Sequence, residues 1–553
     1  MARMTIIRDA GERMSTQNMI RGTMLLTVAT FLSKFLGMIY VIPFNAIIGT
    51  DGGTLYSFAY TPYNILLSIS TVGVPLAVSK FVAKYNSLGD YATGLRVYRY
   101  GLMMMLGTGI VTFLALFFSA EWFAGLMISS DEASSISVAD IAMVLRMISF
   151  ALIIIPAMSI SRGFFQGYHS MGPTAVSTVI EQIVRIIFVL GASYIIIYVM
   201  NGEIATAVGF ATFAAFIGAV ASCLVLAYYW RKRKPYIDQQ LRAQTTSYDL
   251  PIKSIAKEMI VYAIPFVIVG LATPLYQLVD QFTFERAMRA IGESDVFTIY
   301  YAAINLYGHK IILIPVTLAT GMSAAIIPAL TKSFTENDQA GLSEQINKAL
   351  QIIVVLVIPA CIGLVVLSDV AYGALYGLNN IDLTGHVLAW YGPVALLFAL
   401  FTVSAAILQG INKQSFAVIS LTSGLLVKVI FNMSLIHTFG AKGAVLGTGL
   451  AVGVAVVLNL WKMKQSIGFS FKPTLKITVL VLIFSAIMFL AVWLTKFVLG
   501  LFLNYSEVHL YTVIVLGLSV LVGAYVYLWL SYKSTLLEKV LGERTNILRK
   551  IFR

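Results

Sequence analysis

The chain has 553 residues, of which 59% are hydrophobic and only 11% are charged, and its mean hydropathy is +0.87. Soluble domains carry about 25% charged residues, so this composition excludes a soluble protein. The net charge is +13, and the only two cysteines both lie within apolar segments. We therefore expect a membrane protein with no disulfide framework, no bound metal and no cofactor.

Fourteen apolar segments approach the length of about 20 residues that spans the hydrocarbon core of a bilayer. They lie at 22–48, 57–82, 99–119, 140–162, 174–199, 204–230, 258–283, 297–327, 349–368, 388–409, 415–436, 443–461, 475–499 and 510–531. The first is expected to be an uncleaved span, because residues 1–21 are too polar for the apolar part of a signal peptide. The predicted fold is an all-α polytopic membrane protein with 14 transmembrane helices.

Basic residues gather on alternate connections between these spans. They precede the first span and recur at 84–99, 231–242, 413, 462–472 and 533–553. The intervening connections are poor in cations and carry Asp51, Glu203 and Asp382. This positive-inside pattern predicts that both termini are cytoplasmic. It also accounts for most of the net charge, so no nucleic-acid partner is expected.

Two stretches that lie 243 residues apart repeat one another. Residues 164–189 read FFQGYHSMGPTAVSTVIEQIVRIIFV, and residues 407–432 read ILQGINKQSFAVISLTSGLLVKVIFN. Without gaps, Gln166 aligns with Gln409, and Arg185 aligns with Lys428. Such a repeat indicates two related lobes with a path between them, which is the architecture of many transporters.

The repeat, with a weaker similarity between 71–84 and 319–332, predicts the domain organisation. Six spans separate the copies, so both lobes should have the same orientation in the membrane. We expect an N-terminal lobe at 1–230, a basic cytoplasmic linker at 231–256, a C-terminal lobe at 257–470, two further spans at 471–531 and a basic cytoplasmic tail at 532–553.

Ionisable residues inside the spans are the candidates for function, because burying a charge in a bilayer costs about 2.5–3.5 kcal/mol. Lys34 lies in the middle of the first span, on a helical stripe with Thr27, Thr30 and Gly37. This lysine is predicted to line a cavity. The alternatives are an ion pair with another helix and a local bilayer defect.

The repeated segment carries further candidates. Glu181 and Arg185 are spaced i,i+4, so they can pair on one helix face and neutralise each other. Lys428 has Gly424 where the first copy has its glutamate, and it is therefore predicted to meet an external anion. Asp280 is an isolated acid on the seventh span and, with Glu181, a candidate cavity or coupling group.

The remaining candidates lie on the eighth span and at helix ends. His309 and Lys310 sit well inside the membrane, where the histidine either titrates or bonds a carbonyl. The two repeated glutamines, Gln166 and Gln409, are candidate cavity residues. Three lysines at cytoplasmic helix ends either anchor the helices or receive an anionic head group on entry: Lys80, Lys84 and Lys332.

Several segments resemble the polysaccharide-transporter branch of the multidrug/oligosaccharidyl-lipid/polysaccharide exporter superfamily. They include LLTVATFLSKFLGMIYVIPF at 25–44 and SRGFFQGYHSMGPTAVSTVIEQIVRIIF at 161–188, and they are most similar to the YtgP group of MurJ-type lipid II flippases of Gram-positive bacteria. The resemblance implies two six-helix lobes around a cationic cavity, with the last two spans forming a groove for a lipid tail. By it, Lys34 occupies the place of a required basic residue, and His309 or Lys310 falls near another. The family has further basic residues where this chain has Tyr40 and Ser68.

The resemblance implies a flippase that moves an undecaprenyl-pyrophosphate-linked peptidoglycan precursor, lipid II, across a bacterial plasma membrane by alternating access, working as a monomer. A cavity with fixed cations fits this substrate, because carrying a pyrophosphate through hydrocarbon unaided costs tens of kcal/mol. One alternative is a flippase for another lipid-linked oligosaccharide, such as a teichoic, capsular or spore polysaccharide precursor. Another is a cation-coupled drug exporter, which would need unpaired acids in its lobes. An enzyme is not expected, because no connection is long enough for a catalytic domain.

Overall fold

The structure is a computed structural model that describes residues 25–26, 28–71, 74–128, 136–168, 170–244 and 267–541. Within these ranges every regular element is a helix, and no strand occurs. The chain forms two compact units, and in its described part the boundary between them falls between Pro274 and Leu275. That boundary lies inside the segment predicted as the seventh span.

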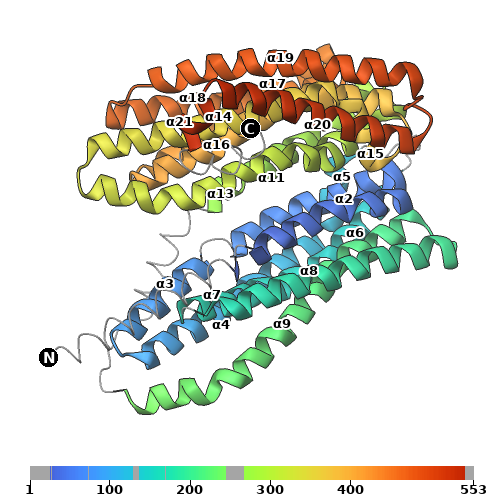
Figure 1. Ribbon diagram of the computed structural model, residues 1–553. Coiled ribbons are helices and arrows are strands. Elements are labelled where there is room, and N and C mark those ends of the chain that lie inside the picture. The colour runs from blue at the N-terminus through green and yellow to red at the C-terminus, as the bar shows by residue number, and fades with distance from the viewer. Residues whose placement is uncertain are drawn as a thin grey trace. The chain divides into compact units, whose positions relative to one another are not determined.

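The first unit is a bundle of helices that run side by side (Figure 1). Residues 28–39 are helical, and a turn at Tyr40 leads from them into the numbered elements. These elements are α2 (Val41–Thr71), α3 (Val74–Ser87), α4 (Tyr91–Phe118), α5 (Ala120–Met127), α6 (Val138–Ser149), α7 (Ala151–Gly167), α8 (Met171–Tyr194), the π-helical η1 (Ile195–Val199) and α9 (Ile204–Arg242).

The first two predicted spans form a hairpin that turns at Gly49. This glycine has φ 68° and ψ −166° inside α2, in the left-handed region that favours glycine. In a straight helix Tyr40 and Tyr56 would lie about 24 Å apart. Their hydroxyl oxygens are instead 3.1 Å apart, so the chain folds back on itself between them.

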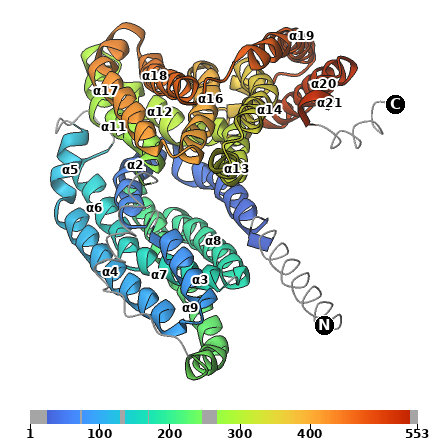
Figure 2. The same ribbon diagram turned by 90° about the vertical axis from the view of Figure 1, so that its left-hand side faces the viewer.

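The second unit begins with α11 (Ala272–Ala290). It continues with η2 (Ser294–Val296), α12 (Phe297–Ala302), the π-helical η3 (Ala303–Tyr307), α13 (Gly308–Thr335), α14 (Gln339–Val366), α15 (Ser368–Tyr376), α16 (Ile381–Gly410), α17 (Gln414–Phe439), α18 (Ala441–Ile467), α19 (Lys472–Phe502), α20 (His509–Lys533) and α21 (Leu536–Leu541). The last two long helices pack beside α14, as Figure 2 shows for α19 and α20.

Eleven helices in the described ranges are long and apolar enough to cross a membrane. One of them, Val28–Thr71, contains the bend at Gly49 and therefore two of the predicted spans. The predicted seventh span begins outside the described residues, and η3 interrupts the eighth. The all-α polytopic membrane fold is confirmed, and the helix count is compatible with fourteen.

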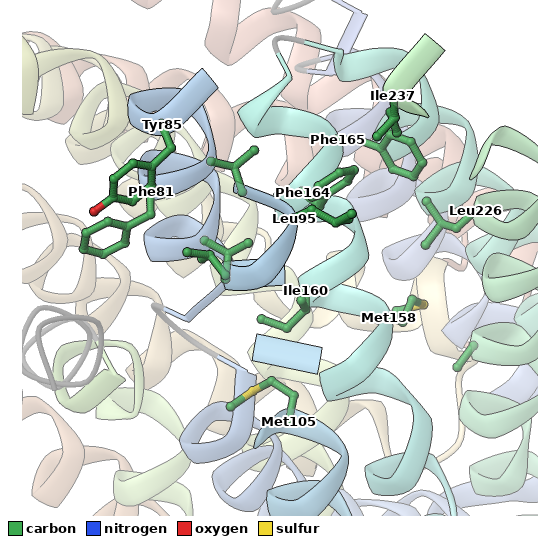
Figure 3. Packing of buried hydrophobic residues seen from close by; sticks show 14 residues of the cluster. Phe81, Tyr85, Leu95, Met105, Met158, Ile160, Phe164, Phe165, Leu226 and Ile237 are labelled. Carbon is green, nitrogen blue, oxygen red and sulfur yellow. The ribbon is translucent and has the colours of Figure 1, made fainter. Parts of the chain in front are cut away.

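The core of the first unit brings α3, α4, α7 and α9 together at one end (Figure 3). Ile237 belongs to this cluster, although it follows the basic run at 231–234. Helix α9 continues to Arg242, so it extends twelve residues beyond the predicted end of the sixth span at 230 and into the segment predicted as the linker. The side chain of Gln244 then bonds the backbone N–H of Ala92 at 2.8 Å and the carboxylate of Asp90 at 3.1 Å, which fixes the end of α9 on the turn before α4.

Candidate functional site

The glycine of each repeated Gln-Gly pair allows two helices to approach closely. A Cβ atom added at Gly167 would lie 2.8 Å from the carbonyl oxygen of Ser79 on α3, and one added at Gly410 would lie 2.8 Å from the Cβ of Leu330 on α13. The two contacts are equivalent, since α7 meets α3 in the first unit as α16 meets α13 in the second. The neighbouring glutamines, Gln166 and Gln409, are both half-buried.

A second repeated position, Ser177 and Ser420, joins three helices in each unit. In the first unit Arg162 on α7 donates to Ser177 on α8 at 3.0 Å and to Ser222 on α9 at 2.8 Å. In the second unit Asn459 on α18 donates to Ser404 on α16 at 3.0 Å and accepts from Ser420 on α17 at 2.5 Å. Both serines are fully buried, so the repeat preserves a junction between helices.

The acid of the first repeat copy pairs with a residue on another helix. Arg162 Nη2 lies 2.7 Å from Glu181 Oε2, and both side chains are mostly buried. The prediction that Glu181 pairs with Arg185 is therefore wrong. Arg162, the last residue of the span predicted at 140–162, was not among the predicted site residues.

Arg185 instead reaches into a cluster of tyrosines between α8 and α2. Its Nη2 donates to the hydroxyl of Tyr60 and, at 3.3 Å, to that of Tyr56, and its guanidinium lies 5.3 Å from the centre of the Tyr60 ring. Its Nε is buried without a hydrogen-bond partner. Within the described ranges no carboxylate pairs with Arg185, so the charge of this half-buried guanidinium is not neutralised by an acid.

Lys34 lies on a helix that packs against α8. The hydroxyl of Ser33 donates to the carbonyl of Thr178 at 3.4 Å, and a Cβ atom at Gly37 would lie 3.2 Å from the Gln182 amide nitrogen. The two helices therefore run in the same direction. Lys34 itself is exposed and makes no hydrogen bond or ion pair with any described residue.

Lys428 is enclosed by oxygen atoms from two neighbouring helices. Its Nζ lies 2.7 Å from Asp280 Oδ2 on α11 and 2.7 Å from Thr448 Oγ1 on α18, and the lysine is 0% exposed. Asn432, one turn farther along α17, donates to Asp280 Oδ1 at 3.0 Å. Lys428 was predicted to meet an external anion, but its ammonium is already paired with the carboxylate of Asp280. The pair also neutralises Asp280, which does not stand alone.

The residues of the eighth predicted span lie inside the second unit. His309 is buried, and its Nδ1 lies 2.8 Å from the hydroxyl oxygen of Tyr391 on α16 rather than near a carbonyl. Lys310 follows it and is half-buried. These positions place His309 in a packed hydrogen-bonding environment and leave Lys310 the more accessible of the two.

The predicted entry lysines lie on α3 and α13. Lys80 and Lys84 are exposed on α3, and the Lys84 ammonium lies 5.7 Å from the centre of the Tyr85 ring. Lys332 belongs to α13, and its side chain lies outside the described residues. Their role on substrate entry stays a prediction.

An ion pair that the sequence did not predict fixes the first of the two additional helices. Lys496 Nζ on α19 lies 2.6 Å from Asp369 Oδ1 and 2.7 Å from Oδ2 on α15, and it also donates to the Val366 carbonyl at 3.2 Å. In the sequence, Lys496 is a charged residue about one helical turn before the end of the predicted span at 475–499. This position was the only sign of the ion pair in the sequence. The pair anchors α19 to the second unit.

An apolar groove lies among α13, α14, α15, α19 and α20. Its volume is about 400 Å³, and its lining is almost entirely aliphatic. Its lining includes Pro315 on α13, Gly363 on α14, Val492 on α19 and Val520 on α20. In the described ranges no group of three or more His, Cys, Asp or Glu side chains is placed to hold a metal ion.

Solved structures of multi-pass membrane transporters share this fold. A solved structure of the lipid II flippase MurJ in an inward closed conformation matches with a TM-score of 0.63 and 18% identity, covering 94% of this chain and all of that one. An inward-facing multidrug transporter of the MATE family matches with a TM-score of 0.62 and 17% identity, over 78% of this chain and 98% of that one.

Sequence comparison then identifies the family. The family model described as polysaccharide biosynthesis protein matches residues 19–334. A Bacillus subtilis protein named lipid II flippase MurJ is 43% identical over 531 residues, which cover 96% of this chain and 98% of that protein. The chain belongs to this polysaccharide biosynthesis family.

Proposed function

We propose that this protein flips lipid II from the inner to the outer leaflet of a bacterial plasma membrane by alternating access of its two lobes. The observation that carries the proposal is the 43% identity to the B. subtilis flippase over nearly the full length of both chains. The protein acts as a transporter and not as an enzyme. The direct test is to deplete the host's lipid II flippase and express this chain alone. Restored growth and transport of lipid II are expected, and failure to support growth at normal protein levels would contradict the assignment.

The pyrophosphate of the substrate is assigned to Arg185 and Lys34. Ser33 meets Thr178 and Gly37 meets Gln182, so Arg185 lies about six residues beyond Lys34 along parallel helices. At 1.5 Å per residue this corresponds to about 9 Å along the membrane normal. Two cations offset in this way allow a pyrophosphate to pass from one to the other. Lys428 is assigned a structural role, because its ammonium is already neutralised by Asp280.

The paired acids argue against a cation-coupled drug exporter. Such coupling needs a carboxylate that can release or bind a cation during the cycle. The two candidates, Glu181 and Asp280, are held by Arg162 and Lys428 at 2.7 Å each. A flippase for another lipid-linked oligosaccharide remains the runner-up, because the cations would bind any polyprenyl pyrophosphate. Expression in a strain that lacks only the flipping of lipid II distinguishes the two functions. A flippase for another lipid-linked oligosaccharide should not restore growth of that strain.

The polyprenyl tail is assigned to the apolar groove beside α19 and α20. A groove of about 400 Å³ lined by aliphatic side chains can hold part of an isoprenoid chain while the head group crosses in the cavity. The hydrocarbon then never has to enter a water-filled space, and burying it in the groove is favourable by about 25 cal/mol per Å² of apolar surface.

Filling this groove is expected to weaken transport. Gly363 lines the groove, and a Cβ atom added there meets nothing within 4 Å, so the side chain of Gly363→Leu should occupy part of the groove. Flipping should fall several-fold because the tail is excluded, while protein abundance stays normal. Gly517→Leu is the matched control, since Gly517 is also in open space on α20 but does not line the groove. Equal transport by the two variants in vesicles would contradict the tail assignment.

The charge pattern assigns both termini to the cytoplasm, and the protein is proposed to work as a monomer. In a background without the two native cysteines, Asp51→Cys and Glu203→Cys should react with an impermeant thiol reagent in intact cells. Arg96→Cys and Lys234→Cys should react only after the cells are opened, because basic connections stay inside. The reverse labelling pattern would overturn this orientation.

A further inference from the structure

A second groove lies in the first unit, away from the residues assigned to lipid II. It has a volume of about 420 Å³ and is formed by α4, α7 and α9, with no contribution from α8 or from α2. Its lining is apolar except for one end. Among its lining residues are Tyr98, Leu102, Leu106, Cys223, Ala227 and Trp230.

One end of the groove is aromatic. Tyr98 stacks on Trp230 with ring centres 5.3 Å apart, and the Tyr98 hydroxyl lies 3.2 Å from the Ser161 hydroxyl. Phe165 packs at the same end, in the cluster that also holds Leu226 and Ile237 (Figure 3). Tyrosine and tryptophan gather at the level of lipid head groups, so this end of the groove lies at the membrane surface.

The same end carries two cations without acidic partners. The Arg233 guanidinium lies 5.8 Å from the centre of the Phe165 ring. Arg99 is exposed on α4, next to Tyr98 in the sequence and seven residues before Leu106, so it lies on nearly the same helix face as Leu106. Neither arginine forms an ion pair with any residue in the part of the chain that the structure describes. Basic residues of this kind attract anionic lipid head groups at the cytoplasmic surface.

From this end the groove extends toward the middle of the membrane. Tyr98, Leu102 and Leu106 follow one another at steps of four on α4, which corresponds to about 12 Å of helix. Beside it, α9 exposes Leu224 and Tyr228, so this face is suited to contact with lipid chains. An elongated apolar groove with cations at its surface end matches the shape and charge of a phospholipid.

We propose that this groove binds an anionic phospholipid, with one acyl chain along α4 and α7 and its phosphate between Arg99 and Arg233. The site goes beyond the flipping of lipid II, because none of its residues belongs to the cation pair or the tail groove. A lipid bound here would brace α4, α7 and α9 at the end where Gln244 fixes α9 to Asp90. It would link the stability of the first unit to the lipid composition of the membrane.

The test measures phosphatidylglycerol and phosphatidylcholine binding to the purified full-length chain by native mass spectrometry. Wild type should retain phosphatidylglycerol preferentially. Arg99→Gln and Arg233→Gln should each weaken that preference about fivefold, because each removes one charge near the head group. Lys232→Gln is the control, since it removes an exposed charge from the same helix on the side away from the groove.

A second measurement reports occupancy of the apolar part. Cys223 lines the groove, so N-ethylmaleimide should label it more slowly in vesicles of phosphatidylcholine mixed with phosphatidylglycerol than in phosphatidylcholine alone. Ala227→Trp fills the groove and should abolish retention of phosphatidylglycerol, whereas Leu224→Trp on the exposed face of α9 should not. Equal retention of the two lipids by wild type, or stronger binding of undecaprenyl phosphate than of phosphatidylglycerol, would overturn the proposal.

Discussion

Replacing Lys428 with methionine is expected to remove most of the protein from the membrane. The substitution leaves Asp280 buried at 2% exposure without the cation that neutralises it. Breaking a buried pair in this way costs about 3–5 kcal/mol, which is a large part of the stability of a typical domain. Protein abundance and resistance to thermal aggregation in detergent are the measurements.

The matched control removes both charges. Lys428→Met combined with Asp280→Asn replaces the ion pair with neutral side chains of similar size, and an asparagine can still accept from Asn432. Abundance should return to near the wild-type level, and flipping should return with it, because the pair is assigned to structure. A double variant that is abundant but inactive would instead place Lys428 in the transport path.

The class of protein could be predicted from the sequence because membrane insertion is governed by short-range properties. Apolar runs of sufficient length must form helices in hydrocarbon, since every backbone polar group has to be bonded within the segment. Some positions of the sequence repeat also have equivalent surroundings in the two units, and there the cause is packing. Gly167 and Gly410 recur because both lie where two helices approach closely, and Ser177 and Ser420 recur because both join three helices.

The partners of the buried charges could not be predicted in the same way. No acid lies within one helical turn of Lys428, but its partner Asp280 lies 148 residues away in the sequence, on α11. Glu181 and Arg185 have the right spacing to pair, but Arg162 reaches the carboxylate from α7. A pattern along one helix shows which pairs are possible, whereas the packing of neighbouring helices decides which pairs form.

Arg162→Ala is therefore expected to lower protein abundance, whereas Arg185→Ala is expected to lower transport at normal abundance. Arg162 holds Glu181, Ser177 and Ser222 together, so its loss strands a mostly buried carboxylate and should lower protein abundance. Arg185 donates its hydrogen bonds to tyrosine hydroxyls and not to a carboxylate, so its loss strands no acid and should leave abundance close to normal. Immunoblots of membrane fractions separate the two variants before any transport is measured.

At normal abundance, Arg185→Ala is expected to reduce lipid II flipping by about tenfold to a hundredfold. This range corresponds to the loss of one charged hydrogen bond to phosphate, about 1.5–3 kcal/mol. Arg185→Lys keeps the charge but not the planar pair of donors, and should retain part of the activity. Tyr60→Phe removes a hydroxyl that Arg185 bonds but leaves the guanidinium in place, and should stay close to wild type. Full activity of Arg185→Ala in a strain depleted of its own flippase would mean that this arginine holds α2 and α8 together and does not bind the pyrophosphate.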